Sequence, residues 1–363
     1  MKRSFNLLLL PFIVLLVSCV HQFPEEDFSR IPFSLNLHFD TDMPIYTEII
    51  HTKSVQEMAD VRQMHDVRYV VNAYKVGSTR DISRVPNESF VFTKPYMGNL
   101  DTTVEINLPE GEYEFKIWAD YVDTGSQDDK YYDTSDFSEI ILSDRNNHPG
   151  SNDYREAFRG YANGTILNPE RYPSSVHDKI DHEAEVTMQR PMGKFIFIST
   201  DVDAFLTKVM KAMLEQTKGD NATIDITTKA GRDQLLQSME FHKYKVCFRY
   251  NIFMPCSFNI FTDKPADSWT GMSFYSDMEL ISETEIAMGF DYAFVNGSTT
   301  TLSISLEVYN EENEQISSTN PINVPIVRNK LTVVKGEFLT TKATGGVAIN
   351  PGWDGDDYNI EIY

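Results

Sequence analysis

Apolar side chains occupy every second position of residues 31–39, in the run IPFSLNLHF. A period of two places these side chains on one face of an extended chain and predicts a half-buried strand. Four further strands are expected at residues 67–76, 89–93, 103–108 and 112–121. Pro109, Glu110 and Gly111 supply turn chemistry before the last of them. Short strands separated by turn signals predict an antiparallel sandwich.

The second half combines strands with one clear helix. One strand is expected over residues 185–199, and its end, residues 195–199, looks apolar on both faces, which fits a buried central strand. Asp201 is a suitable N-cap for a helix over residues 201–217, where apolar side chains recur with helical spacing. A second short helix is expected at residues 231–239. Later strands are expected at residues 244–253, 285–295, 300–309, 331–339 and 357–363.

The chain length predicts more than one domain. A length of 363 residues exceeds what a single hydrophobic core usually spans. Residues 144–182 are rich in Asn, Pro, Asp and Ser, and the boundary is placed at their end. The expected order is a signal peptide (1–19), a tether (20–30), an N-terminal β-sandwich (31–175) and a C-terminal β-sandwich (176–363) with the helix near 201–217.

The first 19 residues have the layout of a secretory signal: Lys2 and Arg3, then an apolar run over residues 7–17, then a small residue and a cysteine. The run is shorter than the ~20 residues that a membrane-spanning helix needs. The recognition sequence Leu16, Val17, Ser18 and the lipid-attachment residue Cys19 resemble the lipobox of bacterial lipoproteins. The alternative is an ordinary signal peptide, cut elsewhere, with a chance cysteine.

Acyl chains such as palmitate on Cys19 would tether a soluble protein to a membrane, because each buried methylene contributes ~0.8 kcal/mol. Glu25, Glu26 and Asp27 follow the cysteine and resemble the signal that sends lipoproteins of Bacteroidota to the cell exterior. The expected location is therefore the outer membrane, lipid-anchored and exposed at the cell surface.

Composition excludes several classes of function. The chain has 54 acidic and 32 basic side chains and a net charge of −22, which repels phosphate backbones and argues against nucleic-acid binding. The eight histidines are scattered, and no HExxH, Gly-x-Ser-x-Gly or glycine-rich phosphate loop occurs. The acidic residues 123–136 lack EF-hand spacing and are interpreted as a solvated loop. No enzyme activity, cofactor or metal is expected.

Two cysteines remain after the signal, Cys247 and Cys256, both within KVCFRYNIFMPCSF. An oxidising destination permits a disulfide between them. If the segment folds as a hairpin, the two can face each other; if it is one bent strand, they lie too far apart to bridge. Both alternatives stay open.

Four stretches carry a resemblance to a known family: GEYEFKIWADYVD (111–123), VTMQRPMGKFIFISTD (186–201), FMPCSFNIFTDKPADS (253–268) and VPIVRNKLTVVKGEFLT (324–340). Together with the lipobox they resemble the fimbrillin-like, or type V pilin-like, lipoproteins of Bacteroidota, in a subgroup known as a domain of unknown function. The resemblance implies a mainly β fold of two tandem transthyretin-like Greek-key β-sandwiches. It also implies fimbrial or adhesive assembly, in which one subunit adds a strand to another's sheet.

The resemblance also implies a processing site. In polymerising relatives a trypsin-like protease cuts after an arginine and removes the first strand. Arg30 stands directly before the first predicted strand, so a cut there would spare that strand; Arg62 and Arg68 are later alternatives. The other interpretation is an ordinary exposed arginine. The C-terminal alternation over residues 357–363 is either a donor strand or the last strand of its own domain.

The leading hypothesis is a surface-anchored structural lipoprotein: an anchor, accessory or tip subunit of a fimbria, or an adhesin. Its partners would be the membrane and other fimbrial subunits. The alternative is a glycan-binding outer-membrane lipoprotein of a nutrient-uptake system. That hypothesis needs exposed aromatic side chains, for which Trp269 and Trp353 are the candidates; Trp118 lies in a predicted strand and is expected in the core.

Overall fold

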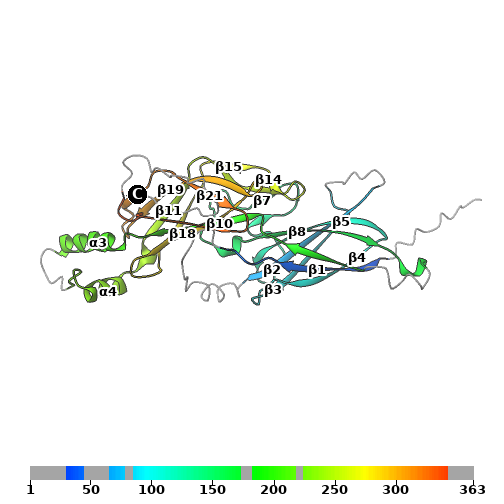
Figure 1. Ribbon diagram of the computed structural model, residues 1–363, viewed down its shortest axis with the longest axis horizontal. Coiled ribbons are helices and arrows are strands. Elements are labelled where there is room, and N and C mark those ends of the chain that lie inside the picture. The colour runs from blue at the N-terminus through cyan, green and yellow to red at the C-terminus, as the bar shows by residue number, and fades with distance from the viewer. Residues whose placement is uncertain (1–29, 45–64, 78–84, 173–181, 218–223, 342–363) are drawn as a thin grey trace, which may run out of the picture.

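A computed structural model describes residues 30–44, 65–77, 85–172, 182–217 and 224–341. The described chain is mainly β, which confirms the predicted class. Figure 1 shows two strand-rich bodies that follow each other along the long axis of the molecule, with the helices α3 (Val202–Thr217) and α4 (Lys229–Ser238) at the outer end of the second body.

The first sandwich packs a three-stranded sheet against a four-stranded one. The first sheet has the order β4-β1-β9, with β4 (Thr102–Leu108), β1 (Ile31–Phe39) and β9 (Glu183–Met188). The second has the order β3-β2-β5-β8, with β3 (Glu88–Pro95), β2 (His65–Lys75), β5 (Gly111–Asp123) and β8 (Phe158–Ile166). One hydrophobic cluster collects side chains from both sheets.

The strand β1 lies in the middle of its sheet. It pairs antiparallel with β4 and parallel with β9. Its alternating side chains Ile31, Phe33, Leu35 and Leu37 are all buried, and the Phe33 ring stacks on Phe115 of the opposite sheet at a centroid distance of 5.6 Å. The alternating apolar side chains of residues 31–39 therefore form the centre of the first core.

The second sandwich also has two facing sheets. One has the order β17-β18-β10-β22, with β17 (Glu279–Leu280), β18 (Ile286–Phe294), β10 (Met192–Ser199) and β22 (Leu331–Gly336). The other has the order β16-β11-β19-β20, with β16 (Ser273–Asp277), β11 (Lys245–Tyr250), β19 (Thr299–Tyr309) and β20 (Gln315–Ser318); β21 (Ile322–Val327) also pairs with β19. The helix α3 packs Val202, Phe205 and Leu206 against this second core.

Short strands lie between the two sandwiches. A small sheet has the order β14-β13-β7-β6, with β14 (Lys264–Pro265), β13 (Ser257–Asn259), β7 (Ile140–Leu142) and β6 (Tyr132–Asp133), beside the pair β12 (Met254–Pro255) and β15 (Ser268–Trp269). Single turns of 3-10 helix are η2 (Asp153–Arg155), η3 (Pro169–Arg171) and η5 (Phe241–Lys243). Trp118 of β5 is fully buried against Tyr132, Phe258 and Phe294. The first sandwich therefore contributes a side chain to the second core.

The single strand expected over residues 185–199 is wrong. The chain forms β9 and β10 there, one in each sandwich, and they are separated by Gln189, Arg190 and Pro191. Both segments are extended, with β9 alternating between polar and apolar residues and β10 mostly apolar, so the sequence pattern merges them. The proline, which cannot donate to a ladder, marks the break. The two hydrophobic clusters do not separate at residue 175, the expected boundary. β9, which follows that residue, belongs to the first cluster, whereas Phe137 and Ile140, which precede it, belong to the second.

Candidate functional site

Arg30 stands at the entrance to β1 and spans the open side of the first sandwich. Its guanidinium forms a forked ion pair with Glu88 of β3, with Nη1 at 2.7 Å from Oε2 and Nη2 at 3.0 Å from Oε1. Nη1 also donates to the carbonyl oxygen of Asn107 in β4 at 2.8 Å. Because β3 and β4 are edge strands of the two facing sheets, one side chain links both edges. The hydrogen bond to Glu88 raises the pKa of Arg30 above its usual value.

The peptide bond after Arg30 is already part of the sheet. Ile31 is in register with Leu108 of β4, and its side chain is buried. A trypsin-like protease needs the arginine side chain free to enter its pocket and an extended accessible chain on both sides. Here the side chain is engaged by Glu88 and the following residues are paired, so cutting at this bond requires local opening of β1.

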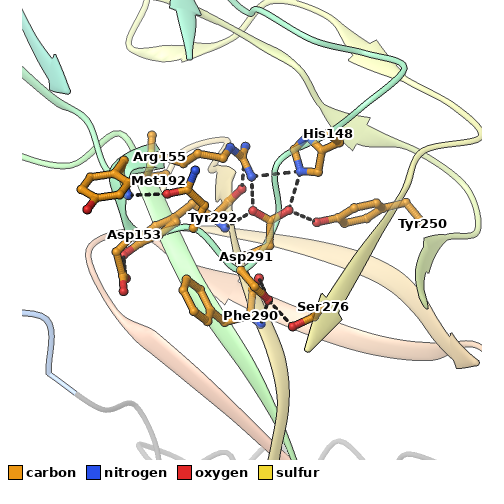
Figure 2. Close-up of polar contacts among 12 residues, drawn as sticks. His148, Asp153, Arg155, Met192, Tyr250, Ser276, Phe290, Asp291 and Tyr292 are labelled. Carbon is orange, nitrogen blue, oxygen red and sulfur yellow. Dashed lines mark hydrogen bonds and ion pairs between the residues drawn. The ribbon is translucent and has the colours of Figure 1, made fainter. Parts of the chain in front are cut away.

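A buried polar network lies in the second sandwich (Figure 2). Asp291 projects from β18 and is bonded by Arg155 of η2, by the Tyr250 hydroxyl at 2.5 Å and by Nε2 of His148 at 2.6 Å. The Asp291 and His148 side chains are 1% and 0% exposed. Residues 148–155 are thereby fixed to the second sandwich just before the chain returns to the first through β8.

Burial sets the charges of this network. Burial alone would raise the pKa of Asp291, but the positive charge of Arg155 and the contact with His148 lower it. Desolvation, followed by the repulsion from Arg155, lowers the pKa of His148. Nε2 of His148 also lies 2.9 Å from Nη1 of Arg155, so the tautomer decides whether it donates to Asp291 or accepts from Arg155. A neutral imidazole beside an Arg–Asp pair is the favoured state.

A second ionic cluster connects the sandwiches at Asp263. This residue has a φ of 55°, in the left-handed region, within the turn between β13 and β14. Its carboxylate accepts from Nε of Arg159 in β8 at 2.8 Å and from Nη1 of Arg328 at 2.6 Å. Burial opposes ionisation, but the two arginines lower the pKa of Asp263 overall. One carboxylate thus joins a strand of the first sandwich to a loop of the second.

Cys247 and Cys256 do not form a disulfide in this structure. Cys247 lies in β11 of a large sheet, whereas Cys256 follows β12 and precedes β13, which pair with other strands. Both thiols are free and buried, and burial raises the pKa of Cys256 to about 12. The segment is neither the hairpin nor the single bent strand, because strand pairing directs its two halves to different sheets.

Several predicted residues lie outside the described residues: Leu16, Val17, Ser18, Cys19, Arg62, Trp353 and the segment 357–363. Trp118 is buried as expected. Trp269 is half-buried in β15, with the Arg145 guanidinium 5.8 Å from its ring centroid. Arg68 is buried and paired with Asp120 of β5.

Within the described part of the chain, no three or more His, Cys, Asp or Glu side chains gather in a way that would hold a metal ion. Among those same residues, no helix has the length and apolar character needed to cross a bilayer.

The sequence pattern of a family of unknown function, DUF6562, matches residues 31–363. The chain belongs to that family. The expected membership of a subgroup of unknown function is therefore confirmed. No curated protein matches this DUF6562 sequence.

Solved structures similar to this DUF6562 chain include the following three proteins. The fimbrial anchor protein Mfa2 from Porphyromonas gingivalis is 10% identical, with 80% of this chain and 82% of that chain covered and a TM-score of 0.37. A fimbrial assembly protein from Parabacteroides distasonis is 9% identical, with coverages of 86% and 92% and a TM-score of 0.35. A protein from Bacteroides ovatus described as a candidate adhesin is 8% identical, with coverages of 90% and 96% and a TM-score of 0.39.

The buried network was missed by sequence reasoning, although one signal was present. Asp291 interrupts an otherwise apolar strand, IAMGFDYAF, and a lone acid in such a run must be paired if it is buried. Its partners could not be found in this way, because Arg155 and His148 lie far from it in sequence and outside any regular pattern.

Proposed function

We propose that this protein is a lipid-anchored structural protein of the cell surface that serves as the anchor or an accessory subunit of a fimbria or adhesin. The observation that carries the proposal is the position of β1. This strand begins 12 residues after Cys19, directly after the tether, and forms the centre of the first core. A tether that continues into a central strand is held by the fold itself.

Retention of β1 distinguishes an anchor from a polymerising subunit. Loss of the strand would unpair both β4 and β9 and would leave an apolar groove where Phe33, Leu35 and Leu37 now lie. Such a groove accepts a donated strand. A subunit that keeps β1 fills its own groove, so a partner subunit can add a strand only at a sheet edge. A cut after Arg30 would spare β1 but separate it from the lipid tether, and we expect the engaged Arg30 to resist that cut.

The test compares the N-terminus of surface-extracted protein with that of an opened variant. Wild type should carry an acylated N-terminus and remain uncut after trypsin-like proteolysis at Arg30. Leu35→Asp, which places a charge in the first core, should free β1 and allow cutting there. If the bond after Arg30 stays uncut in both proteins, pairing of β1 is not what protects it. Wild-type protein that begins at Ile31 would have lost its lipid anchor and would refute the anchor role.

Lipid attachment has its own test. Cys19→Ala should move the protein from the membrane fraction to the soluble fraction, with Cys256→Ala as a thiol control that stays on the membrane. If the Cys19 variant remains membrane-bound, the lipoprotein assignment is wrong.

A glycan-binding role is the second candidate. The observation that favours it is Tyr275 of β16, a residue that is 61% exposed, with the ring of Tyr309 of β19 at a centroid distance of 6.4 Å. An exposed tyrosine beside a half-buried one offers an aromatic surface that suits the apolar faces of sugars. Retention on immobilised surface polysaccharide, lost in Tyr275→Ala and kept in Tyr131→Ala, would support this role; equal retention of both variants would exclude this face.

A further inference from the structure

Two chain segments cross side by side from the first sandwich to the second. Residues 40–44 leave the end of β1; Met43 packs against the second core, and the Pro44 carbonyl accepts from the backbone N–H of Leu331 at the start of β22. Residues 189–191 leave β9 and lead into β10. Because β1 runs parallel to β9, the two segments leave the first sandwich in the same direction.

The side chain of Arg190, in the second of these segments, is hydrogen-bonded to the backbone of the first. Its Nη1 donates to the backbone carbonyls of Asp40 and Asp42, both at 3.1 Å. Its Nη2 donates to the carbonyl of Thr41 at 2.8 Å. Three consecutive carbonyls that follow β1 are therefore held by one guanidinium, whose side chain is only 4% exposed.

Two further segments meet at the same guanidinium. Nε of Arg190 donates to Glu156, just before β8, at 2.6 Å, and Nη1 donates to Oδ1 of Asn329, in the turn before β22, at 2.7 Å. Asn329 in turn donates to the carboxylate of Asp40 at 2.9 Å. The guanidinium also covers the ring of Phe158 at 4.8 Å. The planar, fixed fork of arginine suits such a many-sided contact, and lysine cannot reproduce it.

We propose that Arg190 is a clamp that passes mechanical load from the N-terminal strand to the second sandwich, so that the two sandwiches move and unfold as one unit. A pull on the N-terminus loads β1 along its length, where its ladders with β4 and β9 resist in parallel. At the far end of β1 the load meets the three carbonyls held by Arg190. The source of the pull, a lipid tether, rests on the proposed function; the clamp itself does not.

Calorimetry of the Cys19→Ala protein, which carries no lipid, tests whether the two sandwiches unfold together. We expect one unfolding transition in this parent protein and two in Arg190→Met, since each sandwich then melts alone, the earlier roughly 10 °C below the parent. The matched control is Asp201→Ala. That carboxylate accepts from Ser199, Leu339 and Thr340, all within the second sandwich. It should lower the melting temperature and keep one transition.

A single, merely shifted transition in Arg190→Met would overturn the proposal, because a local structural role gives that result. If Arg190→Met does not fold, Arg190→Lys keeps the charge without the fork and should show the same splitting. An optical trap gives an independent measurement: when the chain is pulled from its two ends, the first rupture of the Arg190 variant should occur at lower force than that of parent and control. Equal rupture forces would exclude a load-bearing clamp. Failure of the Cys19→Ala release test would remove the tether but leave both outcomes unchanged.

Discussion

The inner cores of the two sandwiches are stabilised in different ways; the buried Arg68–Asp120 pair of the first sandwich lies on the face of its sheet that points away from the inner core. The first is closed by an apolar strand whose side chains alternate between core and solvent, and its inner cluster consists of hydrophobic side chains. The second encloses, within an otherwise apolar core, a carboxylate and a guanidinium that neutralise each other, together with a neutral imidazole. Apolar burial is insensitive to pH and tolerant of conservative exchange, whereas a buried ionic group is costly as soon as one partner is lost.

Asp291→Ala should produce the largest effect. The substitution leaves Arg155 and His148 buried without their acceptor, which should cost about 3–5 kcal/mol of unfolding free energy. Urea denaturation measures it. The double variant Asp291→Leu with Arg155→Met removes both charges and should recover much of the loss; no recovery would show that the network contributes more than charge balance.

Leu35→Ala should come next, with a loss of about 2–5 kcal/mol, since it opens a cavity in the middle of β1. The same denaturation experiment measures the change, and Ser34→Ala on the opposite face of the strand serves as the control. A loss below 1 kcal/mol in Leu35→Ala would mean that the first core collapses around the cavity.

The pH dependence should separate the two regions more finely. The pKa of His148 is lowered in the folded protein, so below its ordinary value near 6.5 the unfolded chain binds more protons than the folded one. Stability should therefore fall as the pH decreases through 6.5 toward the folded pKa. Unfolding free energies measured between pH 8 and 5 should show this slope in wild type and a flatter one in His148→Gln. Parallel curves would assign the acid sensitivity to other groups.

Arg249→Ala should have the smallest effect. Its forked pair with Glu307 lies on the outer face of the second sandwich, and the arginine side chain is 46% exposed. Exposed pairs contribute at most about 1 kcal/mol, and added salt should reduce the difference from wild type further. A loss as large as that of Asp291→Ala would mean that exposure is a poor guide to the energetics of this protein.

Regular patterns made much of the fold predictable. The alternation in β1 and β19 and the helical spacing in α3 lead to elements at the expected places. The missed strands β16, β20 and β21 contain four to six residues, so shortness does not explain every miss. The missed strands β6, β7 and β12 to β15 contain two or three residues each, too few for a period to develop. They form only because distant segments supply their partners, as Ile140 finds Phe258.

The candidate sites were less predictable. The sequence marks Arg30 by its place before β1, but its partners Glu88 and Asn107 depend on how two sheets face each other. Arg190 lies in a run whose apolar neighbours suggested one continuous strand, which concealed the crossing it serves. Asp201, expected to cap α3, directs its carboxylate to Leu339 and Thr340 near the end of the described chain. Tertiary contacts decide such roles, and they leave no local pattern.

The parallel pairing of β1 with β9 bears on the order in which the chain becomes structured. Leu35 can pair with Ala184 only after the residues between them have been synthesised. Pairing of β1 with β9 therefore closes a very long loop. Pairings between such distant segments form slowly. A newly made chain would thus expose the apolar face of its first strand until β9 pairs with it, and a chaperone would be most useful to the chain during that interval.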